Sequence, residues 1–167
     1  MTIPSIKGGD RMAIERVRAY LKKWDLDGRI LEFPVSSATV ELAAQAAGVI
    51  PARIAKTLSL MLPDGPVLVV TAGDMKLDNP KFKAQFHAKA KMLSFDQVEA
   101  LVGHAVGDVC PFGVNDGVRT FLDVSLQRFE TVFPACGSAN SAIELTCAQL
   151  AETAQNFEGW IDVCKAM

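Results

Sequence analysis

The sequence predicts a single α+β domain, with a mixed, largely antiparallel sheet surrounded by helices. Short apolar or alternating segments, which are typical of strands, are interleaved with segments whose apolar residues recur at helical spacing. The chain has 167 residues and half of them are hydrophobic, enough for one core that needs no disulfide or metal. We therefore expect a flexible arm over residues 1–9 and one domain over residues 10–167.

Two helices and a short strand are predicted in the first third of the chain. Asp10 can cap a helix with an apolar stripe formed by Ile14, Val17, Leu21 and Trp24. Residues 29–33 are typical of a short strand. A second helix over residues 36–47 begins at one of two adjacent serines and ends at Gly48.

A β-hairpin is the strongest local prediction. Residues 56–62 and 67–72 flank Pro63-Asp64-Gly65-Pro66, whose residue types favour a tight turn. Three leucines at alternate positions of the first strand should share one face. The second strand is apolar on both faces, which predicts that it is central and buried.

Shorter elements are expected in the second half of the chain. Asn79-Pro80 should begin a helix, and residues 89–93 should form a short strand. Capping boxes that start at Ser94 and Thr146 predict two more helices. Residues 103–117 hold four glycines and should be irregular. Further strands are expected near residues 118–124, 130–134, 141–145 and 160–163.

The composition limits the protein class. The net charge is −2, so the molecule as a whole does not attract nucleic acid. The N-terminal residues lack the apolar segment of a signal peptide, and the apolar run at residues 67–72 is too short to cross a bilayer. Without export, the four cysteines should be reduced thiols. We expect a cytoplasmic protein that does not enter a membrane.

Lys56 is the first candidate for chemistry. It opens a strand that otherwise consists of threonine, serine and aliphatic residues. Such a lysine can simply extend to solvent at the sheet edge. Alternatively, an ammonium fixed on a rigid strand beside a cleft can stabilise a developing oxyanion without an altered pKa.

Two glycine-containing segments are further candidates. In residues 103–113 glycines allow the backbone to approach a ligand, and Pro111 stiffens the loop; a long irregular connection is an equal alternative. In residues 135–140, successive backbone N–H groups around Gly137 can form an anion site. A simple hairpin turn is the commoner outcome there.

A thiol nucleophile and a metal site receive less support. Cys110 and Cys136 could act with His104 or His87 as base, but buried structural cysteines are common. No Cys-x-x-Cys or His-x-x-x-His pair is present, so we predict neither a metal nor another cofactor.

The motifs also have an informative order: Ile54-Ala55-Lys56-Thr57-Leu58, the Pro-Asp-Gly hairpin, Val102-Gly103 to Pro111-Phe112-Gly113, Phe121-Leu122-Asp123 and Cys136-Gly137. This order and its spacing, over about residues 38–150, resemble the YbaK/prolyl-tRNA-synthetase-associated family. Members of that family are similar to the editing domain inserted in bacterial prolyl-tRNA synthetases.

The resemblance implies a function and a fold of the editing-domain type. The chain would hydrolyse, in trans, the ester bond of mischarged aminoacyl-tRNA, such as tRNA-Pro or a related tRNA carrying a small amino acid like Cys or Ala. Aminoacyl-tRNA would be its partner, with prolyl-tRNA synthetase as a second one. A non-catalytic module that binds tRNA or a synthetase is the main alternative, and a thiol-dependent hydrolase is another.

The resemblance also implies roles for individual residues. Lys56 would be the essential lysine, and Gly137 would lie beside the substrate ester with Ser138. The ammonium, with backbone amides near Gly137, would stabilise charge while water or a substrate group attacks, without a covalent intermediate. The aminoacyl pocket would be shaped by His104 and by the loop Gly107, Asp108, Val109, Cys110 and Pro111.

At four positions the sequence departs from the pattern of the family. His104 stands where an aromatic residue such as tyrosine is expected. Asp108 and Cys110 replace small residues, and Asn140 replaces a basic one. These departures concern the pocket and the tRNA contact, so they bear on substrate identity.

A basic segment is the candidate tRNA contact. Residues 71–93 contain five lysines and only two acidic residues. Such a patch lets a polyanion dock on one face of an acidic protein, although a solvated face is an equally good interpretation. The lysines are Lys76, Lys81, Lys83, Lys89 and Lys91.

Overall fold

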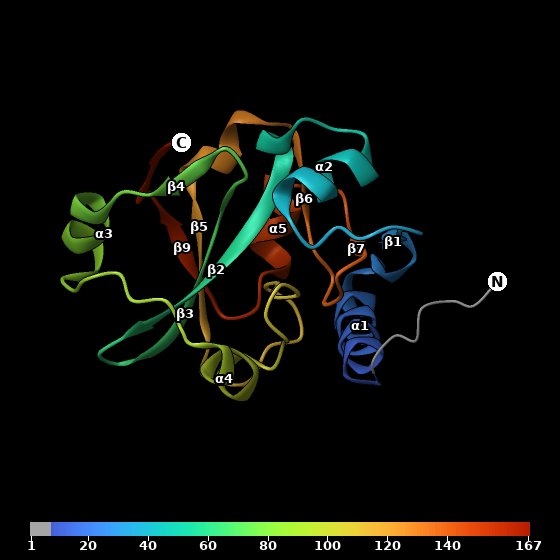
Figure 1. Cartoon of the computed structure of the whole chain (residues 1–167), viewed down its shortest axis with the longest axis horizontal. Helices are drawn as coiled ribbons and strands as arrows, with labels where there is room; N and C mark the ends of the chain where they lie inside the picture. Colours follow the sequence, from blue (N-terminus) through green and yellow to red (C-terminus); the bar gives the residue numbers. More distant parts are fainter. Residues whose placement is uncertain (1–7) are drawn as a thin grey trace.

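A six-stranded sheet lies at the centre of the molecule, with helices around it (Figure 1). The computed structural model describes residues 8–167, and the side chains from Met12 onward. The strand order is β8-β6-β2-β3-β5-β9. Its strands are β2 (Ile54–Leu62), β3 (Gly65–Ala72), β5 (Arg119–Asp123), β6 (Thr131–Pro134), β8 (Leu145–Thr146) and β9 (Phe157–Ile161).

Two small antiparallel pairs flank this sheet. One joins β1 (Leu31–Glu32) to β7 (Ser141–Ala142), and the other joins β4 (Met75–Leu77) to β10 (Cys164–Ala166). Among the described residues four strand pairings are antiparallel and three are parallel. The predicted α+β class with a mixed, largely antiparallel sheet is therefore confirmed.

The β2–β3 hairpin forms as predicted. Leu62 pairs with Gly65 across the two-residue connection, and the register continues to Ala55 opposite Ala72. β3 lies between β2 and β5, and its residues from Val67 to Ala72 are buried. An apolar strand that is covered on both faces is stable only in this central position.

Four of the described α-helices follow a residue whose side chain accepts a backbone N–H group. Both predicted capping boxes are present, at Ser94 for α4 (Phe95–Gln97) and at Thr146 for α5 (Cys147–Thr153). Thr39 caps α2 (Val40–Ala47), rather than either predicted serine, and Asp78 caps α3 (Asn79–Phe86) one residue before the predicted position.

The N-terminal helix α1 (Gly8–Leu21) starts two residues before the predicted cap Asp10. The predicted arm falls mostly on residues 1–7, which lie outside the described residues. Three residues of the predicted apolar stripe, Ile14, Val17 and Leu21, are buried on α1. The fourth, Trp24, lies beyond α1 in the 3-10 turn Lys22–Trp24 and is partly buried. Of the helices that the structure describes, none has the length and apolar character needed to cross a membrane.

Some short elements differ from the prediction. Residues 89–93 form no strand of their own, but Met61 N donates to Lys91 O and Leu93 N donates to Ser59 O, so the segment lies along β2. α4 continues as a π-helix, Val98–Val102, which ends at Gly103 in a left-handed conformation. The strands β4 and β10 were not predicted, because their sequences lack alternation and their stability comes from each other.

Candidate active site

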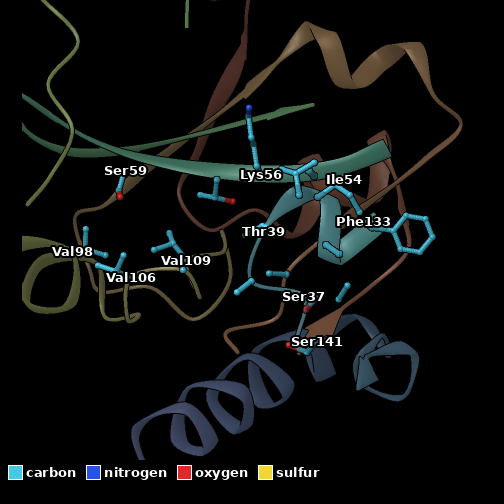
Figure 2. Close-up of a pocket in the computed structure, with 18 of the residues that line it drawn as sticks. Ser37, Thr39, Ile54, Lys56, Ser59, Val98, Val106, Val109, Phe133 and Ser141 are labelled. Carbon is cyan, nitrogen blue, oxygen red and sulfur yellow. The ribbon is translucent and has the colours of Figure 1, made fainter. Parts of the chain in front are cut away.

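A cavity of about 320 Å³ opens beside β2 (Figure 2). Its walls come from the residues before and within α2, the first half of β2, the segment before and within α4, the loop 103–117, and the chain from β6 to β7. Most of its lining is apolar or carries a hydroxyl. The polar members and the principal apolar ones are Ser37, Thr39, Lys56, Thr57, Ser59, Ser141, Ile54, Val98, Val106, Val109 and Phe133.

Lys56 is the single ionisable residue among the described residues that line the cavity. Its ammonium donates to the carbonyl oxygen of Met75 and lies 3.9 Å from Met167 Sδ. Figure 2 shows the side chain directed away from the side of β2 on which Ser37 and Ser141 lie. Lys56 thus lies at the margin of the cavity, and its ammonium is hydrogen-bonded to a backbone carbonyl.

The environment of Lys56 has opposing effects on its charge. Burial lowers the pKa of the Lys56 ammonium, while the nearby groups Cys164, Asp74 and Glu41 act to raise it. Asp74 itself forms an ion pair with Arg128 at 2.6 Å, and the hydrogen bond from Arg128 holds the pKa of that carboxyl below its usual range. The lysine is therefore partly desolvated, and one of the acidic groups near it, Asp74, is itself paired with Arg128.

Thr57 and Ser59 form a polar strip that was not predicted from the sequence. They lie one and three positions after Lys56 on β2, so they project from the opposite face of the strand, and both line the cavity. Thr57 Oγ1 is buried and has no hydrogen-bond partner among the described residues. A buried hydroxyl without a partner costs about 1–3 kcal/mol. The two polar residues at alternate positions of an apolar strand were a signal that could have identified this wall.

The loop 103–117 contributes Val106, Gly107 and Val109 to the cavity. Gly107 has φ +89°, and a β-carbon at that position would meet nothing within 4 Å. The loop is anchored on both sides: Arg16 donates to the carbonyl of Gly103, and Gln155 N donates to the carbonyl of Pro111 at 2.8 Å. It is therefore a fixed wall of the cavity.

Four of the predicted pocket residues are buried and are not among the residues that line the cavity, namely His104, Asp108, Cys110 and Pro111. His104 Nε2 donates to the carbonyl of Phe112 at 2.7 Å, and Cys110 Sγ lies 3.6 Å from the same nitrogen. Burial lowers the pKa of His104 and raises that of the Cys110 thiol to about 12. The contacts of His104 and Cys110 with the Phe112 carbonyl link the two ends of the loop.

Gly137 and Ser138 also support the cavity from behind. Gly137 has φ +88°, and a β-carbon there would lie 3.0 Å from Val17 Cγ2 and 3.1 Å from Ala13 O of α1. Ser138 Oγ is 2.6 Å from Ser141 Oγ, and Ser141 lines the cavity. The glycine thus allows α1 to pack closely, and the serine orients a residue of the wall.

Asn140, at a position where a basic residue was expected, joins two walls of the cavity. The side-chain Nδ2 of Asn140 donates to Phe33 O at 3.1 Å, and the backbone carbonyl of Asn140 accepts from Phe33 N at 2.7 Å. The neighbouring carbonyl of Ala139 accepts from Ser37 N at 2.6 Å. These bonds hold Ser37 at the cavity, and they show a structural use for the amide.

The structure gives little support to thiol chemistry. Cys110 and Cys136 are fully buried, and burial raises the pKa of both thiols. Over the described part of the chain no three His, Cys, Asp or Glu side chains are grouped in a way that could hold a metal ion.

The five lysines of the basic segment do not form one group around the cavity. All are exposed. Lys81 is paired with Asp162 at 3.0 Å and also donates to Cys164 O, whereas Lys89 and Lys91 lie in the segment that leads along β2 to the cavity-lining Met92. The last two are the lysines closest in sequence to the mouth.

Comparison with known proteins gives a consistent result. The sequence profile of the aminoacyl-tRNA editing domain matches residues 35–153. The chain is 50% identical, over 155 residues, to the uncharacterized protein YwhH of Bacillus subtilis (strain 168), covering 92% of this chain and 98% of that one.

Solved structures resemble the fold over nearly its whole length. A candidate trans-editing enzyme for prolyl-tRNA synthetase superposes with a TM-score of 0.83 at 25% identity, covering 97% of this chain and 100% of that one. The hypothetical protein APE2540 superposes with a TM-score of 0.78 at 25% identity, covering 90% and 99%.

Proposed function

The chain belongs to the aminoacyl-tRNA editing domain family, and we propose that it is a deacylase that hydrolyses the ester bond of mischarged aminoacyl-tRNA in trans. The observation that carries the proposal is the cavity beside β2, with Lys56 as its ionisable lining residue. A hydrophobic and hydroxyl-lined wall suits an amino-acid side chain, and a cation at the margin suits the carbonyl of its ester.

In the proposed reaction the aminoacyl group enters the cavity and its ester carbonyl lies at the Lys56 margin. Water, or a nucleophile on the substrate itself, attacks the carbonyl carbon, and the developing oxyanion is stabilised by the ammonium. The carbon–oxygen bond to the ribose then breaks, and the ribose oxygen leaves as a hydroxyl with the proton that the attacking nucleophile gives up. For this step Lys56 exchanges the Met75 carbonyl for the oxyanion, which its long flexible stem permits.

Thr57 is a second donor in the proposal. Its hydroxyl lacks a protein partner among the described residues, so a substrate oxygen can satisfy it at no cost to an existing bond. No strong general base is required, because an aminoacyl ester is already activated. This agrees with the absence of a histidine or carboxylate among the described lining residues.

The amino acid is proposed to be small, such as Cys or Ala, and the tRNA to be tRNA-Pro or a related one. Support comes from the cavity volume of about 320 Å³, at the lower end of the ~300–1,000 Å³ usual for small-molecule sites. The structural neighbour associated with prolyl-tRNA synthetase supports the tRNA identity and a contact with that synthetase. Because aminoacyl-tRNA is made in the cytoplasm, we expect the protein to act there.

A panel of mischarged tRNAs tests the proposal. Wild-type protein should deacylate at least one of them, and Lys56→Ala should lower kcat/KM about 10²–10³-fold while the protein stays folded. Lys56→Arg should also be impaired, because guanidinium differs in shape and hydration. Thr57→Val should cost about 3- to 10-fold, the value of one hydrogen bond. Lys165→Ala, which removes an exposed lysine from β10, is the matched control.

The outcomes separate the alternatives. A non-catalytic binding module would bind tRNA but turn over no substrate in the panel. A thiol enzyme would lose activity on cysteine alkylation and keep it in Lys56→Ala. Wild-type activity in a folded Lys56→Ala protein would remove Lys56 from the site.

A further inference from the structure

Three large apolar side chains that line the cavity are also exposed to solvent. Phe95 is 77% exposed, Met92 53% and Val106 44%, and all three line the cavity. They come from two segments, the start of α4 with the residues before it, and the loop 103–117. Phe95 is the most exposed aromatic side chain that lines the cavity. Exposed apolar side chains that form a patch beside a pocket often mark a binding site.

We propose that Phe95, with Met92 and Val106, is a stacking platform for the terminal nucleobase of the RNA whose aminoacyl group occupies the cavity. The proposal rests on the proposed function. It adds a nucleobase subsite to the cavity, formed by residues that the hydrolytic chemistry does not use.

The proposal places the nucleoside at the mouth of the cavity. With the aminoacyl group inside a volume of about 320 Å³, the attached ribose and base extend toward the opening. At the mouth a base meets either the polar margin at Lys56 or the apolar edge at Phe95. A base has an apolar π-face, and stacking on an aromatic ring is worth about 1–3 kcal/mol whatever the base.

The platform is held in place before any ligand binds. The Ser94 capping box fixes Phe95 at the first position of α4. The residues on either side of Met92 are hydrogen-bonded to β2, through Lys91 O to Met61 N at 2.8 Å and through Leu93 N to Ser59 O at 3.1 Å. Such preorganisation lowers the entropy lost on binding.

Two cations precede the platform along the chain, and the exposed Asp96 and Glu99 follow Phe95. Lys89 and Lys91 are exposed on the segment that runs into Met92, where they can contact the phosphates that precede a stacked terminal base. Single-stranded nucleic acid is typically bound by this combination of an aromatic platform and adjacent cations.

The test uses binding alone, so it does not depend on catalysis. The probes are an uncharged RNA hairpin that copies a tRNA acceptor stem with its single-stranded 3′ end, and the same RNA without its terminal nucleoside. Phe95→Ala should weaken binding of the complete RNA about 5- to 150-fold, the equivalent of ~1–3 kcal/mol. It should not alter binding of the shortened RNA, and Phe95→Tyr should restore wild-type affinity.

Met12→Ala is the control for loss of an exposed apolar side chain, because Met12 is 75% exposed on α1 and does not line the cavity. Equal affinity of wild type and Phe95→Ala for the complete RNA would overturn the proposal. So would an equal loss for both RNAs, since Phe95 would then contact another part of the strand. A wild-type dimer that Phe95→Ala dissociates in sedimentation would show that a second copy of the chain covers the platform instead. Normal discrimination between the two RNAs without any deacylation would leave the subsite standing and reject the proposed hydrolysis.

Discussion

Cys110 is a clear case of a residue whose environment decides between two interpretations. The sequence allowed it to be a nucleophile or a pocket residue. In the structure its thiol is enclosed in the main core with Phe112 and Cys136, and burial raises its pKa to about 12. The thiolate is the reactive form of cysteine, and near neutral pH Cys110 is almost entirely in the unreactive thiol form.

We therefore expect Cys110 to resist modification in the folded protein. A thiol reagent at pH 7–8 should label partly exposed Cys147 before Cys110 or Cys136, and all four cysteines only after unfolding. Since deprotonation requires a pH close to 12, the deacylation rate should show no ascending limb from Cys110 between pH 6 and 10. Mass-mapped alkylation and the pH–rate profile of Cys110→Ser measure both effects. Rapid labelling of Cys110 in native protein would contradict the structure.

At Lys56 and Thr57 the sequence predicted the strand but not which side chain faces the cavity. Alternation along β2 required that the two residues point to opposite faces. Which face borders the cavity depends on α2, α4 and the loop 103–117, and these are placed by contacts distant in sequence. The role of Lys56 in stabilising the oxyanion stays a prediction, and the role of Thr57 as a second donor is a further one.

Among the elements, those with local signals were predicted best. The capping boxes at Ser94 and Thr146 and the β2–β3 hairpin are specified by residues a few positions apart, and all three are present. The short strands β4 and β10 and the extended segment at residues 89–93 depend on partners far along the chain. Their own residues carry no periodic signal, so the sequence could not specify them.

Helix α1 provides a test of the role of Gly137. The sequence resemblance implied that this glycine lies beside the ester, whereas in the structure its Cα faces α1. Gly137→Ala should place a methyl group against Val17 and force a left-handed backbone onto a residue with a β-carbon. We expect a loss of roughly 1–3 kcal/mol in the free energy of unfolding, measured by denaturant titration.

Gly117→Ala is the matched control for that measurement. Gly117 also has a positive φ, +85°, but a β-carbon there meets nothing within 4 Å, so only the backbone strain remains. A Gly137→Ala protein of unchanged stability whose KM for aminoacyl-tRNA rises would instead favour a substrate contact.

For the whole molecule, the distribution of charge matters more than the net charge of −2. Lys81 is occupied by Asp162, while Lys89 and Lys91 approach the cavity mouth on an exposed segment. The five lysines of the predicted basic segment thus have different surroundings and do not act as one face. We propose that the pair nearest the mouth contributes most to tRNA binding.

Replacing Lys89 and Lys91 with glutamate should weaken tRNA binding and reduce its dependence on salt. Each phosphate contact contributes about 0.7–0.9 to the slope of log K against log salt, so two lost contacts should flatten it by about 1.5. Filter binding between low and moderate salt measures the slope. The same charge change at exposed Lys22 and Lys23 after α1 is the control, and an equal effect of the two double variants would indicate a non-specific response to net charge.

The order of the strands in the central sheet could not be predicted from the sequence. The chain pairs β3 in parallel with β5 and β5 in parallel with β9, so that Val67 lies opposite Arg119. Apolar strands at these positions are compatible with several orders, and the choice follows from how α1, α3 and α5 cover the two faces. The fold class could be predicted because it depends on the inventory of elements, whereas the strand order depends on their packing.

The residues that line the cavity are spread along the chain from residue 37 to residue 142, so the cavity can form only late in biosynthesis. Ser141 and Ala142 complete a wall that begins at Ser37, so a nascent chain has no complete cavity until all of these residues have left the ribosome. The deacylase activity that we propose would therefore be absent throughout most of the protein's own translation, when its growing end is itself esterified to a tRNA.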